Sequence, residues 1–284
     1  MRPLSEFLSI PDPPTIWLID PYVSRSGITF IHGRTSIGKS PLTWEMARCM
    51  SLGIPFLGWN TTQCRVLYVE ADTPSVVVRP RLRLLPEPQG DWWIDCVHEL
   101  GLDIAEPNQS TVAWLKRARE IKPEAVFWNT LRSLTRKDLS KGETVSAFYT
   151  TLRVAFPNAA HIITHHNRKE STREDAVEIP EEDHSGSSGW RDIAQIALHL
   201  RKRVVGEKSY LSLEHTKTQG SPMMSPTKFT LDEDGTTLIQ DQRLAWIRER
   251  VSQGVSIHET EACRELNISR ATYFRLLAQV RLGA

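Results

Sequence analysis

The sequence predicts an α/β fold in which helices cover a mostly parallel sheet, followed by a small all-α segment. Three observations predict it. Short apolar runs alternate with amphipathic stretches over residues 1–240, as in sheets built from strand–helix–strand units. A glycine-rich loop separates the first of these strand-type runs from a helical stretch. Residues 241–284 show helical patterns only, which places a domain boundary at 240/241.

The predicted strands are short runs rich in β-branched and aromatic residues, at 27–32, 65–70, 124–128, 161–164, 193–200 and 209–215. Residues 228–231 and 236–239 are expected to form a closing hairpin. The predicted helices cover 41–50, 73–85, 110–121 and 142–154, although Pro80 opposes the second because proline breaks helix interiors. The charged, glycine- and serine-rich stretch 168–189 is expected to be a loop.

Composition excludes several protein classes. The 284 residues are 40% hydrophobic and 24% charged, which is ordinary for a globular protein. No apolar run approaches the ~20 residues of a membrane span, and the first residues lack the apolar stretch of a signal peptide. The four cysteines show no CxxC spacing, so neither a zinc site nor a disulfide framework is indicated. We therefore expect a cytoplasmic location.

A phosphate-binding motif follows the first predicted strand. Residues 33–40 match the pattern GxxxxGK[ST], with a strand before it and a helix after it. Such a loop turns backbone N–H groups toward phosphate oxygens, while Lys39 supplies charge and Ser40 a hydroxyl for Mg²⁺. The motif predicts binding of a nucleoside triphosphate, with Mg·ATP expected. The nucleotide-binding residues are Gly33, Arg34, Thr35, Ser36, Ile37, Gly38, Lys39, Ser40 and Pro41.

Two carboxylates end the second predicted strand. Glu70 and Asp72 lie where a parallel sheet presents side chains to a ligand, at its carboxyl edge. Glu70 is the candidate base that activates water, and Asp72 is the second candidate. The alternative is that both serve a turn before Thr73 and Pro74.

With these motifs in view, the chain resembles the RecA-like ATPases of the RepA-type hexameric replicative helicase group. The resemblance rests on segments in the same order, spanning roughly residues 30 to 220. They lie at 33–40, 66–72, 125–132, 162–166, 186–191 and 215–217.

This resemblance implies roles for individual residues. Glu70 would activate water, and His165 and His166, after the fourth strand, would sense the γ-phosphate. A late basic residue would reach the nucleotide of a neighbouring subunit. Lys217 matches that position, with Arg203 or Arg201 as alternatives. The family also implies ATP and Mg²⁺ as cofactors, DNA as a partner and a homo-oligomer, with six subunits in that family.

The third strand departs from the family pattern. It normally ends in an aspartate that holds the magnesium shell, and here that position is Asn129. Asparagine can hydrogen-bond a metal-bound water but brings no negative charge. We therefore expect Ser40 and Asn129 at the metal, and three outcomes stay open: slow or regulated hydrolysis, nucleotide binding without turnover, or an active enzyme with rearranged ligands.

Histidine and tryptophan side chains also have structural alternatives. A histidine beside a buried strand is often a core residue, which applies to His165 and His166. Trp190, Trp92 and Trp93 are candidates for stacking on bases, but such residues more often belong to a core or an interface.

The C-terminal segment resembles a helix-turn-helix. Its predicted helices are 243–253, 257–266 and 270–280, and arginines outnumber acids there. Ser269 would cap the last helix, and a small core would contain Ala262, Leu266, Ile268 and Leu276. The DNA-facing residues would be Arg270, Thr272, Tyr273 and Arg275. The alternative is a three-helix cap that packs on protein.

Two main functions follow from these features. The first is an ATP-hydrolysing, helicase-like oligomer that acts on DNA in replication or recombination of a plasmid, phage or mobile element. The second is an ATP-binding regulator or helicase loader with little or no turnover, which Asn129 favours. A small-molecule kinase shares the loop, but the histidine pair and Lys217 argue against it.

Overall fold

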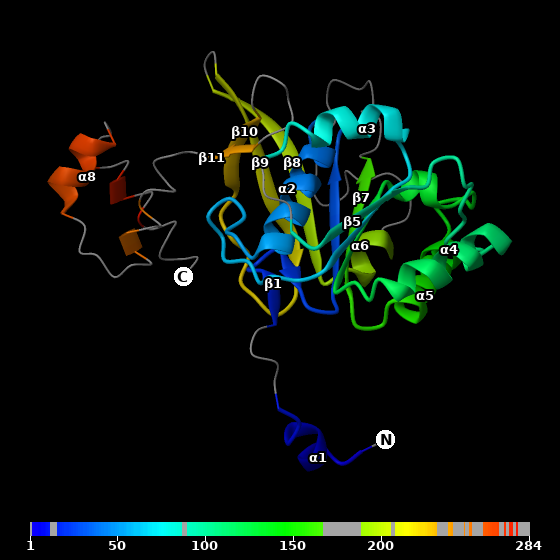
Figure 1. The fold of residues 1–284 in the computed structure, drawn as a ribbon. Coiled ribbons are helices and arrows are strands. Elements are labelled where there is room, and N and C mark those ends of the chain that lie inside the picture. The colour runs from blue at the N-terminus through cyan, green and yellow to red at the C-terminus, as the bar shows by residue number, and fades with distance from the viewer. Residues whose placement is uncertain are drawn as a thin grey trace, which may run out of the picture.

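A nine-stranded sheet is the centre of this computed structural model (Figure 1). The structure describes residues 2–11, 16–86, 90–166, 189–205, 208–231, 238–240, 247, 250–251, 258–266, 270, 273–274 and 277. In spatial order, the strands are β11 (Leu238–Gln240), β10 (Thr227–Leu231), β9 (Lys208–Thr218), β8 (Ile196–Val205), β3 (Ile28–Gly33), β7 (Ala160–His166), β6 (Ala125–Asn129), β4 (Val66–Glu70) and β5 (Trp92–Cys96).

The sheet is mostly parallel, as the sequence predicts. Every pairing from β8 through β3, β7, β6 and β4 to β5 is parallel, whereas β9, β10 and β11 continue the other edge antiparallel. The carboxyl ends of β3, β4, β6 and β7 therefore share one edge of the sheet. That edge is where a doubly covered parallel sheet presents a ligand site.

Helices cover both faces of the sheet because successive strand side chains point to opposite sides. Tyr68 of β4 packs in one core with α2 (Lys39–Leu52) and α3 (Ser75–Leu82). Its neighbours Leu67 and Val69 pack in a second core with α4 (Gln109–Glu120) and α5 (Gly142–Ala155). The central strands are buried on both faces, which explains their continuous apolar sequences.

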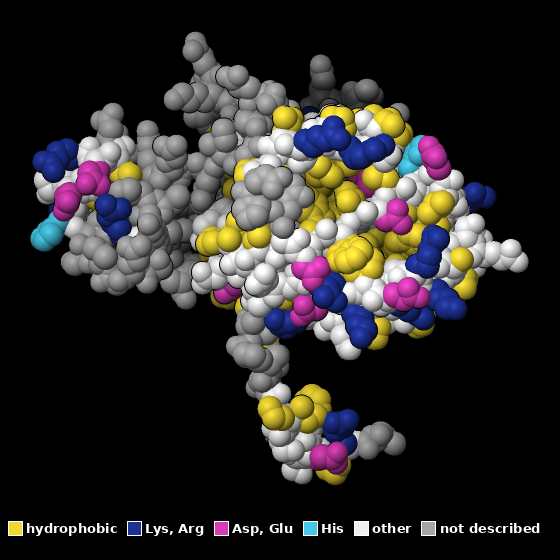
Figure 2. Space-filling model, in the orientation of Figure 1, with side chains coloured by type: hydrophobic (Ala, Val, Ile, Leu, Met, Phe, Trp, Pro, Cys, Tyr) yellow, Lys and Arg dark blue, Asp and Glu magenta, His cyan; other side chains and the backbone are white. Residues whose placement is uncertain are grey.

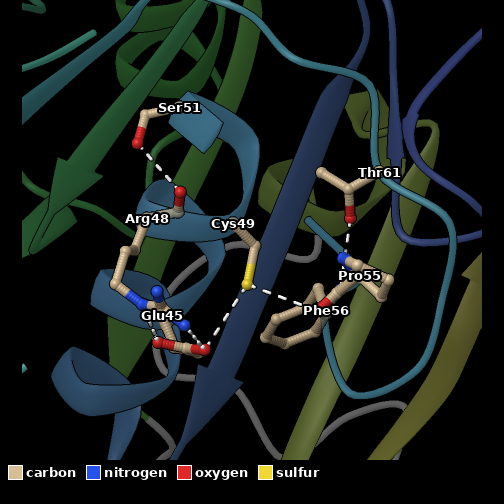
Figure 3. Close-up of polar contacts among 7 residues, drawn as sticks. All are labelled: Glu45, Arg48, Cys49, Ser51, Pro55, Phe56 and Thr61. Carbon is tan, nitrogen blue, oxygen red and sulfur yellow. Dashed lines mark hydrogen bonds and ion pairs between the residues drawn. The ribbon is translucent and has the colours of Figure 1, made fainter. Parts of the chain in front are cut away.

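Helix α2, which begins inside the phosphate motif, is held by polar contacts near its end (Figure 3). Arg48 donates two hydrogen bonds to the carboxylate of Glu45, at 2.8 and 2.7 Å. The Cys49 thiol contacts the same carboxylate at 3.4 Å and the carbonyl oxygen of Pro55 at 3.5 Å. Burial raises the pKa of this thiol well above its usual range. Of these contacts, the one between Cys49 and Pro55 joins the helix to the chain that follows it.

Some elements differ from the sequence predictions. Strand β5 was not expected, because its residues Trp92–Cys96 are half-buried or exposed at the sheet edge and lack an apolar pattern. Helix α6 (Gly189–Ile193) takes the start of the predicted strand 193–200. Helix α3 is shorter than predicted but includes Pro80. The predicted loop 168–189 lies outside the described residues except for Gly189.

Shorter elements complete the described chain. Helix α1 (Leu4–Leu8) has no buried residue, and β1 (Trp17–Ile19) pairs antiparallel with β2 (Val23–Ser24). A short 3-10 turn, η1 (Leu131–Leu134), follows β6. None of the helices in the described ranges is long and apolar enough to cross a membrane.

The three candidate tryptophans occupy different environments. Trp190 is fully buried, donates to the carbonyl oxygen of Leu139 at 2.8 Å, and is therefore a core residue rather than a base-stacking one. Trp92 packs partly against the core, whereas Trp93 is 53% exposed. Figure 2 shows basic side chains over α3. In this helix, the guanidinium of Arg81 lies 4.8 Å from the ring centroid of the buried Trp44.

The C-terminal segment is described in part. Helix α8 (Glu259–Glu265) lies within the predicted helix 257–266. Its Ala262 packs with Ile247, Tyr273 and Leu277 in a small apolar cluster, against which Leu266 also lies. Tyr273 is 2% exposed, so the expectation that it faces outward is wrong. Several sequence predictions for this segment fall outside the described residues. They concern most of the predicted helices 243–253 and 270–280, the domain boundary at 240/241, and Ser269, Ile268, Leu276, Thr272 and Arg275.

Candidate nucleotide-binding site

The phosphate motif forms a tight connection between β3 and α2. Gly33 ends the strand, and a Cβ atom there would lie 2.8 Å from the backbone oxygen of Leu200. Gly38 caps α2 at φ 107°, a conformation that side chains with a Cβ rarely adopt. Both glycines of the motif are therefore required, Gly33 by the close approach of Leu200 and Gly38 by its backbone conformation. The helix N-terminus that they allow points backbone N–H groups at the site, which suits an anion.

The Lys39 side chain is folded into this loop. Its Nζ donates to the carbonyl oxygens of Gly33 and Arg34, at 2.8 and 2.7 Å, and lies 3.2 Å from Nδ1 of His166. The residue is only 5% exposed. Burial lowers the pKa of Lys39 to about 8, against the opposing effect of the Asp72 carboxylate. The ammonium is therefore poorly solvated, and a polyphosphate at this loop would give it an anionic partner.

Glu70 lies at the end of β4 and is fully buried. Its Oε1 accepts backbone N–H bonds from Asp72 and Thr73, at 3.0 and 3.1 Å. Its Oε2 accepts from the side-chain amide of Asn129 at 2.6 Å. Burial raises the pKa of Glu70, although these three hydrogen bonds oppose the rise. Glu70 thus stabilises the turn before Thr73 and Pro74, which the sequence left open as an alternative. The same carboxylate also lies at the candidate nucleotide site, through its contact with Asn129.

Asp72 is exposed just beyond Glu70. Its Oδ1 accepts a hydrogen bond from the hydroxyl of Ser133 at 2.9 Å. Its charge also acts on Lys39, whose pKa it tends to raise. Asp72 therefore offers a solvated carboxylate at the same edge of the sheet as the phosphate motif.

Asn129 joins the phosphate motif to Glu70. Its Nδ2 lies 2.6 Å from Glu70 Oε2 and 3.3 Å from Ser40 Oγ, and its Oδ1 accepts from the hydroxyl of Thr164 at 2.6 Å. A carboxylate can only accept, so the NH₂ group must be the part that faces Glu70. The atom presented to Ser40 is consequently a donor, which cannot ligate a cation. The expected place of Asn129 at the metal, through a hydrogen bond to a metal-bound water, stays a prediction.

The two histidines of β7 face different surroundings. His166 lies at the loop, where its Nδ1 is also 3.2 Å from Thr35 Oγ1, and burial together with Lys39 lowers its pKa. His165 is 1% exposed, and its ring centroid is 5.9 Å from that of Phe30. Of the two, His166 is therefore the one near the phosphate loop, and His165 fits the core alternative. The strand places them so because neighbouring side chains alternate in direction.

The late basic residues have partners within their own chain. Lys217 Nζ donates to the carbonyl oxygens of Arg191 and Asp192, at 3.2 and 2.5 Å. Arg203 pairs with Glu214 at 2.7 Å. The Nε of Arg201 donates to His199 at 3.0 Å. These contacts hold the side chains on β8 and β9, so a role toward a neighbouring subunit stays a prediction.

A cavity of 280 Å³ adjoins the phosphate motif and was not predicted from the sequence. Ser36 and Ile37 form its wall on the motif side, while Tyr210 and Lys202 come from β9 and β8. The cavity is completed by Leu211, Thr230 and Leu231. No local pattern marks these residues, because strand pairing alone brings them beside the loop.

A family model described as an AAA domain matches residues 3–172, which is more than half of the chain. The chain belongs to this AAA-domain family. No curated protein matches its sequence.

Solved structures share the fold of this AAA domain at low sequence identity. One of them, an ATPase domain, is 13% identical, with a TM-score of 0.57, covering 76% of this chain and 84% of that one. A KaiC-like protein from Pyrococcus horikoshii OT3 is 10% identical, with a TM-score of 0.52 and coverages of 78% and 93%. The flagellar accessory protein FlaH from Methanocaldococcus jannaschii is 13% identical, with a TM-score of 0.50 and coverages of 75% and 89%. The predicted RecA-like P-loop core is confirmed.

The residues of this AAA domain fit a nucleoside triphosphate. The two glycines allow the tight connection from which α2 presents its N-terminus, and Lys39 supplies a buried cation beside it. For Mg²⁺, the oxygen donors at hand are the Ser40 hydroxyl and the carboxylates of Glu70 and Asp72, which are hard ligands of the kind that magnesium takes. When bound, such an ion neutralises charge on phosphate oxygens.

The nucleic-acid residues predicted in the C-terminal segment of this AAA-domain protein are described only in part. Arg270 has 75% of its side chain exposed and pairs with Glu259 at 2.5 Å. Its guanidinium lies 5.8 Å from the ring of Phe274. Tyr273, by contrast, is buried in the apolar cluster. A DNA-contacting role thus stays a prediction for Arg270, Thr272 and Arg275.

Proposed function

We propose that this chain binds Mg·ATP at the loop Gly33–Ser40 and hydrolyses it with Glu70 as the water-activating carboxylate. One observation supports this proposal above the others. Asn129 contacts both Ser40 of the phosphate loop and Glu70, so one side chain joins the loop to the carboxylate. A base must lie beside the phosphate site to act on an attacking water. The ATPase domain among the similar structures supports the same activity.

Each residue has a defined task in this proposal. Lys39 binds the β- and γ-phosphates after leaving the carbonyl oxygens of Gly33 and Arg34. His166, which contacts Lys39 in this structure, is positioned to respond to the γ-phosphate. Glu70 accepts the proton of the attacking water, and the raised pKa of this buried carboxyl suits a base better than an ordinary one.

The nucleobase is assigned to the cavity next to the motif. The cavity shares Ser36 and Ile37 with the loop, so a nucleoside attached to the bound phosphates can enter it. Tyr210 offers an aromatic ring for the base, and Lys202 and Thr230 offer polar contacts at the wall. Most nucleotide sites combine apolar walls with a few polar groups in this way.

The wider role that we propose is a cytoplasmic homo-oligomer, with six subunits on the family resemblance, that acts on DNA. The resemblance to the RepA-type replicative helicase group supports this role, together with the basic C-terminal segment that contains Arg270, Thr272 and Arg275. Lys217 or Arg203 would reach the neighbouring nucleotide after exchanging its present partner. The setting would be replication or recombination of a plasmid, phage or mobile element.

The second candidate function is an ATP-binding regulator or helicase loader. It is favoured by Asn129, which removes the acid expected at the end of β6 and presents a donor to Ser40. Such a protein would use ATP for assembly and turn it over slowly or not at all.

The test is ATP hydrolysis by the purified chain, alone and with single- or double-stranded DNA, with subunit number measured by light scattering. Lys39→Ala should abolish ATP binding and turnover, while Lys116→Ala, at an exposed position of α4, should match the parent. Turnover that rises with DNA supports the motor. ATP-dependent assembly without turnover supports the regulator, and absence of ATP binding overturns both.

A further inference from the structure

Three buried side chains form a hydrogen-bonded chain across the ends of β7, β6 and β4. Thr164 Oγ1 donates to Asn129 Oδ1 at 2.6 Å, and Asn129 Nδ2 donates to Glu70 Oε2 at 2.6 Å. The residues are 1%, 2% and 0% exposed, respectively. Solvent cannot replace either bond at this depth, so the geometry depends on these partners.

The direction of the chain follows from its chemistry. The ionised Glu70 can only accept, which fixes the amide NH₂ group toward it and leaves Asn129 Oδ1 facing β7. The Thr164 hydroxyl supplies the proton at that oxygen. Its other acceptor, the carbonyl oxygen of Trp128, lies at 3.4 Å, so the bond to Asn129 is the shorter and stronger one.

Asn129 has a second contact that makes its orientation matter for the nucleotide. The same Nδ2 lies 3.3 Å from Oγ of Ser40, at the start of α2. The two hydrogens of one amide group therefore point to the carboxylate and to the loop. A turned amide would place Oδ1 against the ionised Glu70, where two acceptors face each other, and the contact with the carboxylate would be lost.

We propose that Thr164 is a positioning residue of the nucleotide site, which holds Asn129 so that its amide NH₂ group sets the place of Glu70 opposite Ser40. The inference rests on the proposed ATPase function, in which Glu70 activates water. Thr164 does not touch the nucleotide in this scheme. It acts through Asn129, and its hydroxyl is the part that matters.

The decisive comparison is Thr164→Val, which keeps the shape and removes the hydroxyl, against Thr164→Ser, which keeps the hydroxyl. Thr29→Val is the matched control, because Thr29 is also a 1%-exposed strand residue and donates at 2.9 Å to a carbonyl oxygen, that of Tyr22, away from the site. We expect Thr164→Val to lower kcat about tenfold or more, since a small misplacement of a reacting group is costly. The dissociation constant for ATP should change less than about threefold, because Lys39 and the loop stay intact.

Serine at 164 should restore most of kcat, while Thr29→Val should leave it near the parent value. Equal kcat in Thr164→Val and Thr29→Val overturns the proposal, and so does a serine variant as slow as the valine variant. A general loss of structure would instead weaken ATP binding together with kcat, and the serine rescue excludes it.

A second measurement separates this inference from the proposed function. Thr164 and Glu70 make no direct contact here, so their effects on stability should be independent unless Asn129 links them. In a double-mutant cycle with Thr164→Val and Glu70→Ala, we expect a coupling of about threefold or more in the unfolding equilibrium constant. The cycle with Thr29→Val should be additive. Coupling in a protein without turnover keeps the positioning role while the ATPase function fails, and additivity overturns the positioning role.

Discussion

The Nζ atom of Lys39 lies 3.2 Å from Nδ1 of His166, which joins the start of α2 to the end of β7. The ammonium form of Lys39 can only donate, so beside it His166 accepts through Nδ1 and is neutral. In the proposed function, a phosphate that takes the ammonium would release the imidazole, and this one contact would couple the γ-phosphate to the end of β7.

The first prediction concerns the pH dependence of ATP binding. Burial lowers the pKa of Lys39 to about 8 in the free protein, and a polyphosphate partner raises it again. Above pH 8, binding must therefore take up a proton, so affinity falls as pH rises. Between pH 7.5 and 9, we expect a loss of about fivefold to tenfold, measured calorimetrically with a non-hydrolysable ATP analogue. Lys39→Arg stays charged throughout and should abolish this dependence, whereas a parent with flat affinity would contradict it.

The second prediction concerns the close approach at Gly33. A Cβ atom there meets the backbone oxygen of Leu200 at 2.8 Å, and a paired strand cannot move aside alone. Gly33→Ala should lower the free energy of unfolding by about 1–3 kcal/mol in urea titrations and weaken ATP binding as well. Gly142→Ala is the control, because no atom lies within 4 Å of its Cβ position. It should be neutral or slightly stabilising, and equal losses in both variants would refute the steric explanation.

The third prediction concerns the cavity that Tyr210 lines. Removing the ring should weaken ATP binding about tenfold, the size of one lost base-stacking contact. Tyr210→Ala should leave the affinity for inorganic tripolyphosphate unchanged, because the ring is assigned to the base alone. Tyr210→Phe keeps the ring and should bind ATP as the parent does. If ATP and tripolyphosphate lose affinity equally, the base lies elsewhere.

The sequence predicts the features that depend on local chemistry. The motif around Lys39 and the carboxylate of Glu70 can be recognised in the sequence, because phosphate-binding loops and strand ends at ligand sites have characteristic residues. Prediction from sequence fails where the direction of a side chain on its strand decides which residue reaches the site. His165 and His166 are the same residue type at adjacent positions, yet side chains alternate along a strand, so only His166 faces the loop.

Other site features depend on which strands are neighbours. Tyr210 reaches the cavity because β9 and β10 pair beside the loop, and Thr164 reaches Asn129 because β7 adjoins β6. Neither pairing is visible in a single sequence. Tyr273 was misplaced for a related reason: a one-position error on a helix exchanges a buried side chain for an exposed one.

The last prediction concerns Asn129→Asp, which would supply the missing acid. In this structure the substitution sets two carboxylates at the 2.6 Å contact with Glu70. One of them must hold a proton, which raises the pKa of the pair in the folded state only. Because that group binds more protons when folded, its contribution to stability is present at low pH and lost as pH rises. Relative to the parent, we expect Asn129→Asp to be destabilised by about 1–3 kcal/mol at pH 8 and less at pH 5.

The matched variant is the exchange Glu70→Gln with Asn129→Asp. It restores one donor facing one carboxylate, and the introduced aspartate can still accept from Thr164, so much of the loss at pH 8 should be recovered. Urea unfolding of the parent and both variants at the two pH values measures this. An Asn129→Asp protein that is as stable as the parent at pH 8 would show that the two carboxylates separate. The introduced aspartate at the end of β6 would then be a candidate magnesium ligand.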